Sequence, residues 1–152
     1  MVEFSKQAEA LGILAMESFR LNSKFLAAGD RLGRDLNITS SRWQVLGSLI
    51  NADQPMTVAQ IARQMGLKRQ SVQRVTDWLW EQQLVEYQSN PRHRRAKLVE
   101  PTDKGISAHK RLEGRRAVWA DDVATDIDFE ALQTTIETIR QLRAVLEKES
   151  HS

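Results

Sequence analysis

The chain has 152 residues, enough for one domain with a hydrophobic core or for two small lobes. It contains no cysteine, which excludes disulfides and thiolate zinc sites and fits a reducing compartment. No basic segment followed by an apolar core opens the sequence, and no apolar run is as long as a membrane span, so we expect a soluble, cytoplasmic protein.

The net charge of +2 conceals an uneven distribution of charge along the chain. Residues 63–116 carry 13 Lys or Arg against 6 Asp or Glu, whereas the two flanks together carry 9 against 14. A basic middle between acidic ends is the electrostatic pattern of a protein that binds nucleic acid. A solvated basic surface without a partner is the alternative interpretation at this point.

Two helices are predicted in the first third of the chain. One spans about 5–32, and its apolar residues recur at spacings of three, four and seven, so they share one face. That face consists of Leu11, Leu14, Leu21, Phe25, Ala28 and Leu32. The other helix begins at Thr39 as N-cap, with an inner face of Trp43, Leu46, Leu49 and Ile50.

A pair of helices joined at a glycine follows. The first carries a capping box of Thr57 and Gln60 and ends at Gly66. The second runs from about 68 to 83, and three apolar residues spaced by three and four point inward. These inward residues are Val72, Val75 and Leu79, which leaves Arg69, Gln70, Gln73, Arg74 and Asp77 together on the outer face.

A basic hairpin comes directly after the helix pair. Two strand-like runs, 84–88 and 96–100, flank a loop with an Asn-Pro turn signal. Within 92–97 the loop holds four fixed positive charges and a histidine, and no acid. These charges repel one another unless a polyanion lies against them.

Two further helices complete the chain. Thr102 caps a helix that reaches about Asp121, and a last helix opens at Asp128. The apolar stripe of the last helix is Leu132, Ile136, Ile139, Leu142 and Leu146. The stripes of the first and last helices each need a partner, and a monomer of this size offers too little core to cover both.

The helix pair and the basic hairpin together predict a winged helix-turn-helix that binds DNA. Arginine suits guanine O6 and N7, glutamine suits adenine N6 and N7, and a narrow minor groove attracts guanidinium groups. The expected contacts from the second helix are Lys68, Arg69, Gln70, Ser71, Gln73 and Arg74. Those from the wing are Arg92, Arg94, Arg95 and Lys97, with the lysines on phosphates.

Over nearly its whole length the sequence resembles the MarR family of winged-helix transcription regulators. The matching segments are "ITSSRWQVLGSL", "TVAQIARQMGLKRQSVQRVTDWLWEQQLV" and "NPRHRRAKLVEPTDKG". Arg94-Arg95 and the run 102–105 stand where the family has Asp-Arg-Arg and Leu-Thr-x-x-Gly. His93 replaces the wing aspartate, Gln83 a helix-ending glycine, and Lys68 an N-cap Ser or Thr.

The resemblance implies a mainly α fold with a small β-hairpin wing (α+β) and an obligate homodimer. The DNA-binding lobe would span 37–101, and dimerisation helices would lie in 1–36 and 102–152. The implied function is binding to a pseudo-palindromic operator, usually for repression, that a small phenolic ligand often relieves. Such a ligand would lodge between the lobe and the dimerisation helices.

Three side chains are expected at such a ligand pocket, namely Trp43, Met16 and Trp119. For Trp43, an ordinary core position is favoured about two to one, and a lone Met on a helix is usually filler. Trp78 and Trp80 flank an inward leucine, so one of them is expected to be partly exposed.

We expect no enzyme activity, no cofactor and no metal. The three histidines are scattered, and no Ser-His-Asp or phosphate-loop pattern is present. Two alternatives to a ligand-controlled repressor remain open. One is a DNA-binding regulator without a ligand, and the other is a winged-helix module that binds an acidic protein partner.

Overall fold

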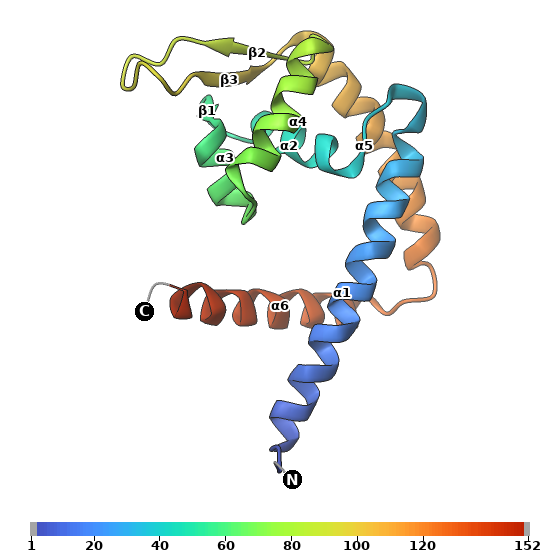
Figure 1. Ribbon diagram of the computed structural model, residues 1–152. Coiled ribbons are helices and arrows are strands. Elements are labelled where there is room, and N and C mark those ends of the chain that lie inside the picture. The colour runs from blue at the N-terminus through green and yellow to red at the C-terminus, as the bar shows by residue number, and fades with distance from the viewer. Residues whose placement is uncertain (1–2, 151–152) are drawn as a thin grey trace. The chain divides into compact units, whose positions relative to one another are not determined.

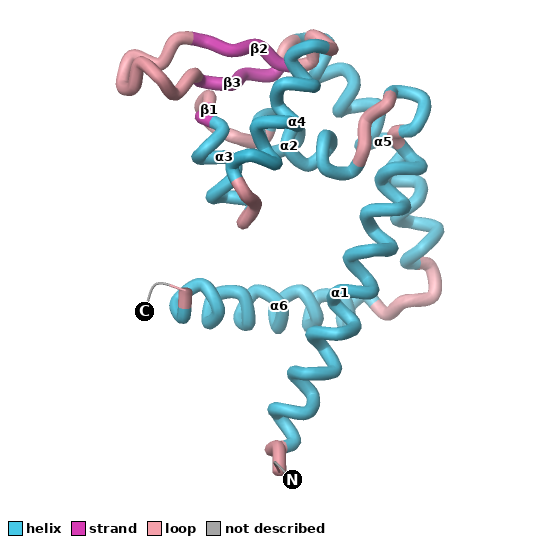
Figure 2. Tube along the Cα trace, viewed as in Figure 1, coloured by secondary structure: helices cyan, strands magenta, loops and turns pink. Residues whose placement is uncertain are grey.

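The computed structural model describes residues 3–150, which divide after Arg116 into two compact units. The elements are α1 (Lys6–Leu32), η1 (Arg34–Leu36), α2 (Ser40–Ile50), β1 (Met56–Thr57), α3 (Val58–Met65), α4 (Arg69–Glu81), β2 (Val85–Gln88), β3 (Leu98–Pro101), α5 (Asp103–Ala124) and α6 (Phe129–Glu149). Most of them are helical, with one small antiparallel sheet (Figure 1, Figure 2). None of the helices in this described part of the chain has the length and apolar character needed to cross a bilayer.

The core of the first unit lies where α2, α3, α4 and the strands meet the start of α5 (Figure 1). Thr39 caps α2 as predicted, and its hydroxyl accepts a hydrogen bond from the Arg42 N–H at 3.4 Å. The apolar core residues are Ile38, Trp43, Val45, Leu46, Leu49, Val58, Ile61, Ala62, Val72, Leu79, Leu84, Val85, Val99 and Leu112. The inward faces predicted for α2 and α4 thus join residues of α3 in a single cluster.

The long helix α1 packs against the lobe through its C-terminal part only. The Ser40 hydroxyl donates to the Leu26 carbonyl at 2.6 Å, and the Ser40 N–H donates to Asp30 at 2.7 Å. Toward the N-terminus the predicted apolar stripe is about half exposed, at 49% for Leu11 and 51% for Leu21. The helix is confirmed, and most of its apolar face is not buried within the chain.

The first part of α5 is fixed to the lobe by packing and by an ion pair. Leu112 is fully buried, and the guanidinium of Arg115 binds both carboxylate oxygens of Asp35 at 2.6 and 2.8 Å. Arg115 also donates to the Leu32 carbonyl at 2.6 Å. The hydrogen bond from Arg115 lowers the pKa of Asp35 from 3.8 to about 2.

The sheet has three strands in the order β1-β3-β2, all antiparallel. The hairpin of β2 and β3 was predicted, although 96–97 belong to its loop and not to its second strand. The short strand β1, in which Thr57 pairs with Leu98, was not predicted. Two residues are too few for an alternating pattern, so only the pairing with β3 defines this strand.

The second unit contains the end of α5 and all of α6. Asp128 caps α6 by accepting a hydrogen bond from the Ala131 N–H at 2.9 Å, at the predicted start. α5 continues to Ala124, a few residues past the expected end. Four of the five residues of the predicted α6 stripe are exposed, namely Leu132, Ile136, Ile139 and Leu146, at 36 to 58%.

Candidate nucleic-acid interface

The helix pair α3 and α4 has clear start and stop signals. The Gln60 side chain accepts from the Thr57 N–H at 2.8 Å, and the Thr57 hydroxyl accepts from the Gln60 N–H at 3.2 Å, so the predicted capping box is present. Gly66 closes α3 in the left-handed conformation with φ of 64°. Lys68 occupies the N-cap of α4 without a side-chain hydrogen bond, which confirms that this cap is lost.

Helix α4 is held from its inner side. Val72 and Leu79 are buried, and the buried Thr76 hydroxyl donates to the Val72 carbonyl at 2.8 Å. The polar residues on the opposite face are therefore turned outward. Lys68, Arg69, Gln70, Ser71 and Arg74 are exposed, and Gln73 is half-buried.

The turn that ends α4 uses a residue with a side chain where glycine is usual. Gln83 has φ of 60°, and the Leu84 N–H reaches back to the Leu79 carbonyl at 2.9 Å. With the Gln83 N–H bonded to Trp80, these bonds form a Schellman motif. The helix ends at Glu81, two residues before the predicted end, and Gln83 takes the left-handed conformation that suits the glycine it replaces.

The wing, residues 85–101, carries its cations on a loop built from two tight turns (Figure 2). The Asn90 side chain accepts from the Arg92 N–H at 3.0 Å, and Nδ1 of His93 accepts from the Ala96 N–H at 3.2 Å. His93 thus supplies a hydrogen-bond acceptor at the position where the MarR family, which the sequence resembles, has an aspartate. Four cations of this loop are exposed, and within residues 3–150 none of them forms an ion pair: Arg92, Arg94, Arg95 and Lys97.

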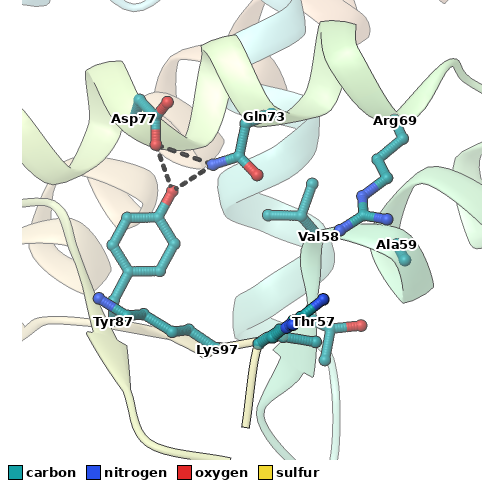
Figure 3. A pocket seen from close by; sticks show the side chains of 10 residues that line it. Thr57, Val58, Ala59, Arg69, Gln73, Asp77, Tyr87 and Lys97 are labelled. Atoms are coloured by element: carbon teal, nitrogen blue, oxygen red, sulfur yellow. Dashed lines mark hydrogen bonds between the residues drawn. The ribbon is translucent and has the colours of Figure 1, made fainter. Parts of the chain in front are cut away.

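A cleft of about 280 Å³ separates α4 from the wing, and the start of α3 forms its floor (Figure 3). It is lined by Thr57, Val58, Ala59, Arg69, Gln73, Asp77, Tyr87, Arg95, Ala96 and Lys97. Four of the predicted DNA contacts therefore border one concave surface, although two come from α4 and two from the wing. The short strand β1 brings the start of α3 against the base of the wing.

Asp77 and Tyr87 connect α4 to the wing at the edge of this cleft. The Tyr87 hydroxyl donates to Oδ1 of Asp77 at 2.6 Å, and Nε2 of Gln73 lies 2.9 Å from the same oxygen. Tyr87 was not predicted as a site residue. Tyr87 lies two residues after the buried Val85, so the alternation along β2 puts it on the inner face of the strand. Nothing in that alternation indicates which side chain of α4 it contacts.

The three residues expected at a ligand pocket have different environments. Trp43 belongs to the core of the first unit, with 9% exposure. Met16 is 55% exposed on α1. Trp119 is half-buried in the second unit.

The two tryptophans that flank Leu79 differ in exposure. Trp80 is 53% exposed, whereas Trp78 is half-buried beneath the guanidinium of Arg42, 3.6 Å from the ring centroid. The prediction that one of the pair is exposed is confirmed.

Between residues 3 and 150, no three His, Asp or Glu side chains are grouped so that they could hold a metal ion.

Comparisons with known proteins find a family model and a relative that match this chain. The model of the MarR family matches residues 36–96. An uncharacterized protein of Mycobacterium tuberculosis, Rv2011c, is 30% identical over 142 residues, which are 93% of this chain and 98% of that protein.

Solved structures match the fold over most of the chain. The MarR family transcription regulator SP03579 superposes with a TM-score of 0.80 at 16% identity, covering 96% of both chains. CouR from Rhodococcus jostii RHA1, solved with bound p-coumaroyl-CoA, has a TM-score of 0.75 at 19% identity, over 85% of this chain and 90% of CouR. At these identities the likeness concerns the fold.

Proposed function

The chain belongs to the MarR family of transcription regulators, and from this premise we propose that it binds a pseudo-palindromic operator as a homodimer. The observation that supports DNA binding is the cleft between α4 and the wing. Arg69 lies on one side, with Arg95 and Lys97 on the other, and none of the three is neutralised by an ion pair within residues 3–150. Unpaired cations that converge from two elements suit a polyanion.

The proposed roles divide the cations and amides between the two grooves. Arg69, Gln70, Ser71, Gln73 and Arg74 of α4 would contact base edges in the major groove, and Lys68 would contact a phosphate. The loop residues Arg92, Arg94 and Arg95 would follow the backbone or enter the adjacent minor groove, and Lys97 would contact a phosphate.

The exposed apolar faces support the homodimer. Phe19, Leu21 and Phe25 of α1 are 51 to 70% exposed, and Ile136 and Ile139 of α6 are 46% exposed. Helices with this many exposed large apolar side chains are typical of protein interfaces. We therefore assign 1–36 and 102–152 to dimerisation and 37–101 to DNA binding. Two-fold symmetry would set the recognition helices one turn of B-DNA apart, about 34 Å.

We also propose that the protein represses its target and that a small aromatic ligand relieves binding. The support is the likeness to CouR, whose structure holds p-coumaroyl-CoA. A protein that must meet chromosomal DNA would act in the cytoplasm. A melting-temperature screen with hydroxybenzoates and hydroxycinnamates tests the ligand, because specific binding raises the melting temperature. No shift with any of them would favour a regulator that acts by occupancy alone.

The decisive experiment is selection from a library of random duplexes with the full chain, followed by salt titrations on the selected and on a shuffled duplex. We expect a site with two related half-sites, tighter binding to it, and an affinity that falls steeply with salt. Sedimentation of the complex should give two chains per site. Equal, salt-insensitive binding to both duplexes would refute DNA reading and favour an acidic protein partner.

A further inference from the structure

We propose that Asp77 and Tyr87 hold the amide of Gln73 so that only its carbonyl oxygen faces the DNA, and that Gln73 therefore recognises the amino group of adenine or cytosine. This inference rests on the proposed function, since it concerns how α4 distinguishes base pairs. It differs from the two-bond contact with adenine that glutamine usually makes.

The three side chains form a closed triangle of hydrogen bonds. Nε2 of Gln73 lies 2.9 Å from Oδ1 of Asp77 and 3.1 Å from the Tyr87 hydroxyl, and that hydroxyl lies 2.6 Å from the same Oδ1. Gln73 and Asp77 are one helical turn apart on α4, whereas Tyr87 comes from β2. Figure 3 shows the nitrogen of Gln73 turned toward both partners and its carbonyl oxygen turned away from them.

The chemistry of the partners determines the orientation of this amide. An ionised carboxylate only accepts hydrogen bonds, so the group of Gln73 that faces Asp77 must be its NH2. The opposite orientation would place two acceptor oxygens in contact. Orientation of the Gln73 amide thus follows from the network and does not depend on distinguishing nitrogen from oxygen by position alone.

Tyr87 completes the arrangement because it both donates and accepts. Burial raises the pKa of Tyr87 far above its ordinary value, and the neighbouring Asp77 carboxylate raises it further. The hydroxyl therefore keeps its proton and donates it to Asp77. Its lone pairs remain available to the NH2 group of Gln73.

The consequence for recognition follows from the base edges in the major groove. Adenine N6 and cytosine N4 donate, whereas guanine O6 and N7 and thymine O4 accept. A carbonyl oxygen alone pairs with the first two and is repelled by the others. We expect A or C at this position to be preferred over G or T by roughly five- to tenfold, the ratio that one hydrogen bond supplies.

The test uses the full chain and the duplex selected from the random library. All four base pairs are placed at each half-site position, and binding constants are compared for wild type and Gln73→Ala. The position at which Gln73→Ala removes a preference is the one that Gln73 reads. Wild type should prefer A or C there.

Asp77→Asn then tests the positioning role. Asparagine can donate as well as accept, so the Gln73 amide becomes free to turn its NH2 toward the base. We expect the ratio of A or C over G or T to fall by several-fold. Tyr87→Phe should lower this ratio in the same direction by less, because Asp77 still holds the amide.

Glu81→Gln is the matched control for charge. It removes one negative charge from the same helix outside the triangle. Loss of an acid strengthens binding to every duplex, so Asp77→Asn and Glu81→Gln should both bind more tightly. Only Asp77→Asn should change the ratio of binding constants between A or C and G or T. Thermal melting of each variant confirms that it is folded.

The outcomes separate the two proposals. If wild type enriches no sequence, the proposed function fails and this inference fails with it. If a site is found but Gln73→Ala changes no position, the reading role of Gln73 is refuted while DNA binding stands. A position that requires G or T, or adenine with cytosine rejected, would overturn the acceptor-only contact. An unchanged ratio in Asp77→Asn would overturn the role of the network.

Discussion

Helix α4 and the wing tip present their polar groups in opposite ways. On α4, a side chain such as Gln73 stands on a helix backed by buried Leu79 and is bound by neighbouring side chains. On the wing tip, Arg94 and Arg95 are exposed, and their loop is shaped by backbone turns around Asn90. Fixed geometry suits the reading of base edges, whereas exposed charge suits phosphates, which are the same in every sequence.

Leu79→Ala is expected to disrupt the packing that holds α4 against the core. Leu79 is fully buried beneath α4, and such a truncation costs about 2–5 kcal/mol of unfolding free energy. Urea denaturation at one fixed protein concentration measures it. Leu67→Ala is the matched control, because Leu67 is 48% exposed and should lose far less. Similar losses in the two variants would show that α4 is not anchored from its inner side.

Arg94→Ala is expected to weaken DNA binding by the wing without unfolding the lobe. One phosphate contact contributes about one unit of slope to a plot of log affinity against log salt. We therefore expect the slope to become shallower by about one on selected and shuffled duplexes alike. Arg20→Ala, on α1 and away from the wing, should leave the slope unchanged. A wild-type slope in Arg94→Ala would exclude this arginine from the interface.

Gln83→Gly is expected to stabilise the protein by relaxing the turn between α4 and the wing. A side chain in the left-handed region costs about 1–2 kcal/mol, of which the entropy of an unfolded glycine offsets part. The net expectation is a gain of about 0.5–1 kcal/mol in unfolding free energy. Gln82→Gly, at φ of −83°, should instead lose stability. If both substitutions shift the midpoint in one direction, strain at Gln83 is not the cause.

The sequence was informative about elements whose signals are local. The capping box of Thr57 and Gln60, the left-handed Gly66 and the N-cap Asp128 each depend on residues within one helical turn. Side-chain periodicity likewise identified the buried faces of α2 and α4. Predictions of this kind succeed because the interactions that decide them occur between near neighbours.

Contacts between distant segments could not be predicted in this way. The strand β1 exists only because β3 pairs with it, about 40 residues later. Asp35 and Arg115 are far apart in the chain, and no spacing rule connects them. Such contacts depend on how the elements pack, which a pattern along a single chain does not encode directly.

Periodicity, caps and charge are local properties, so the helices, the basic hairpin and the outward polar face of α4 could be predicted from the amino-acid sequence. The end of the Gln73 amide that faces Asp77 and Tyr87, in contrast, follows from packing in three dimensions. That orientation depends on Tyr87, which a turn and a strand bring against α4 from 14 residues away. The residue type at position 73 is known from the sequence, whereas the donor or acceptor that it presents depends on its neighbours in space.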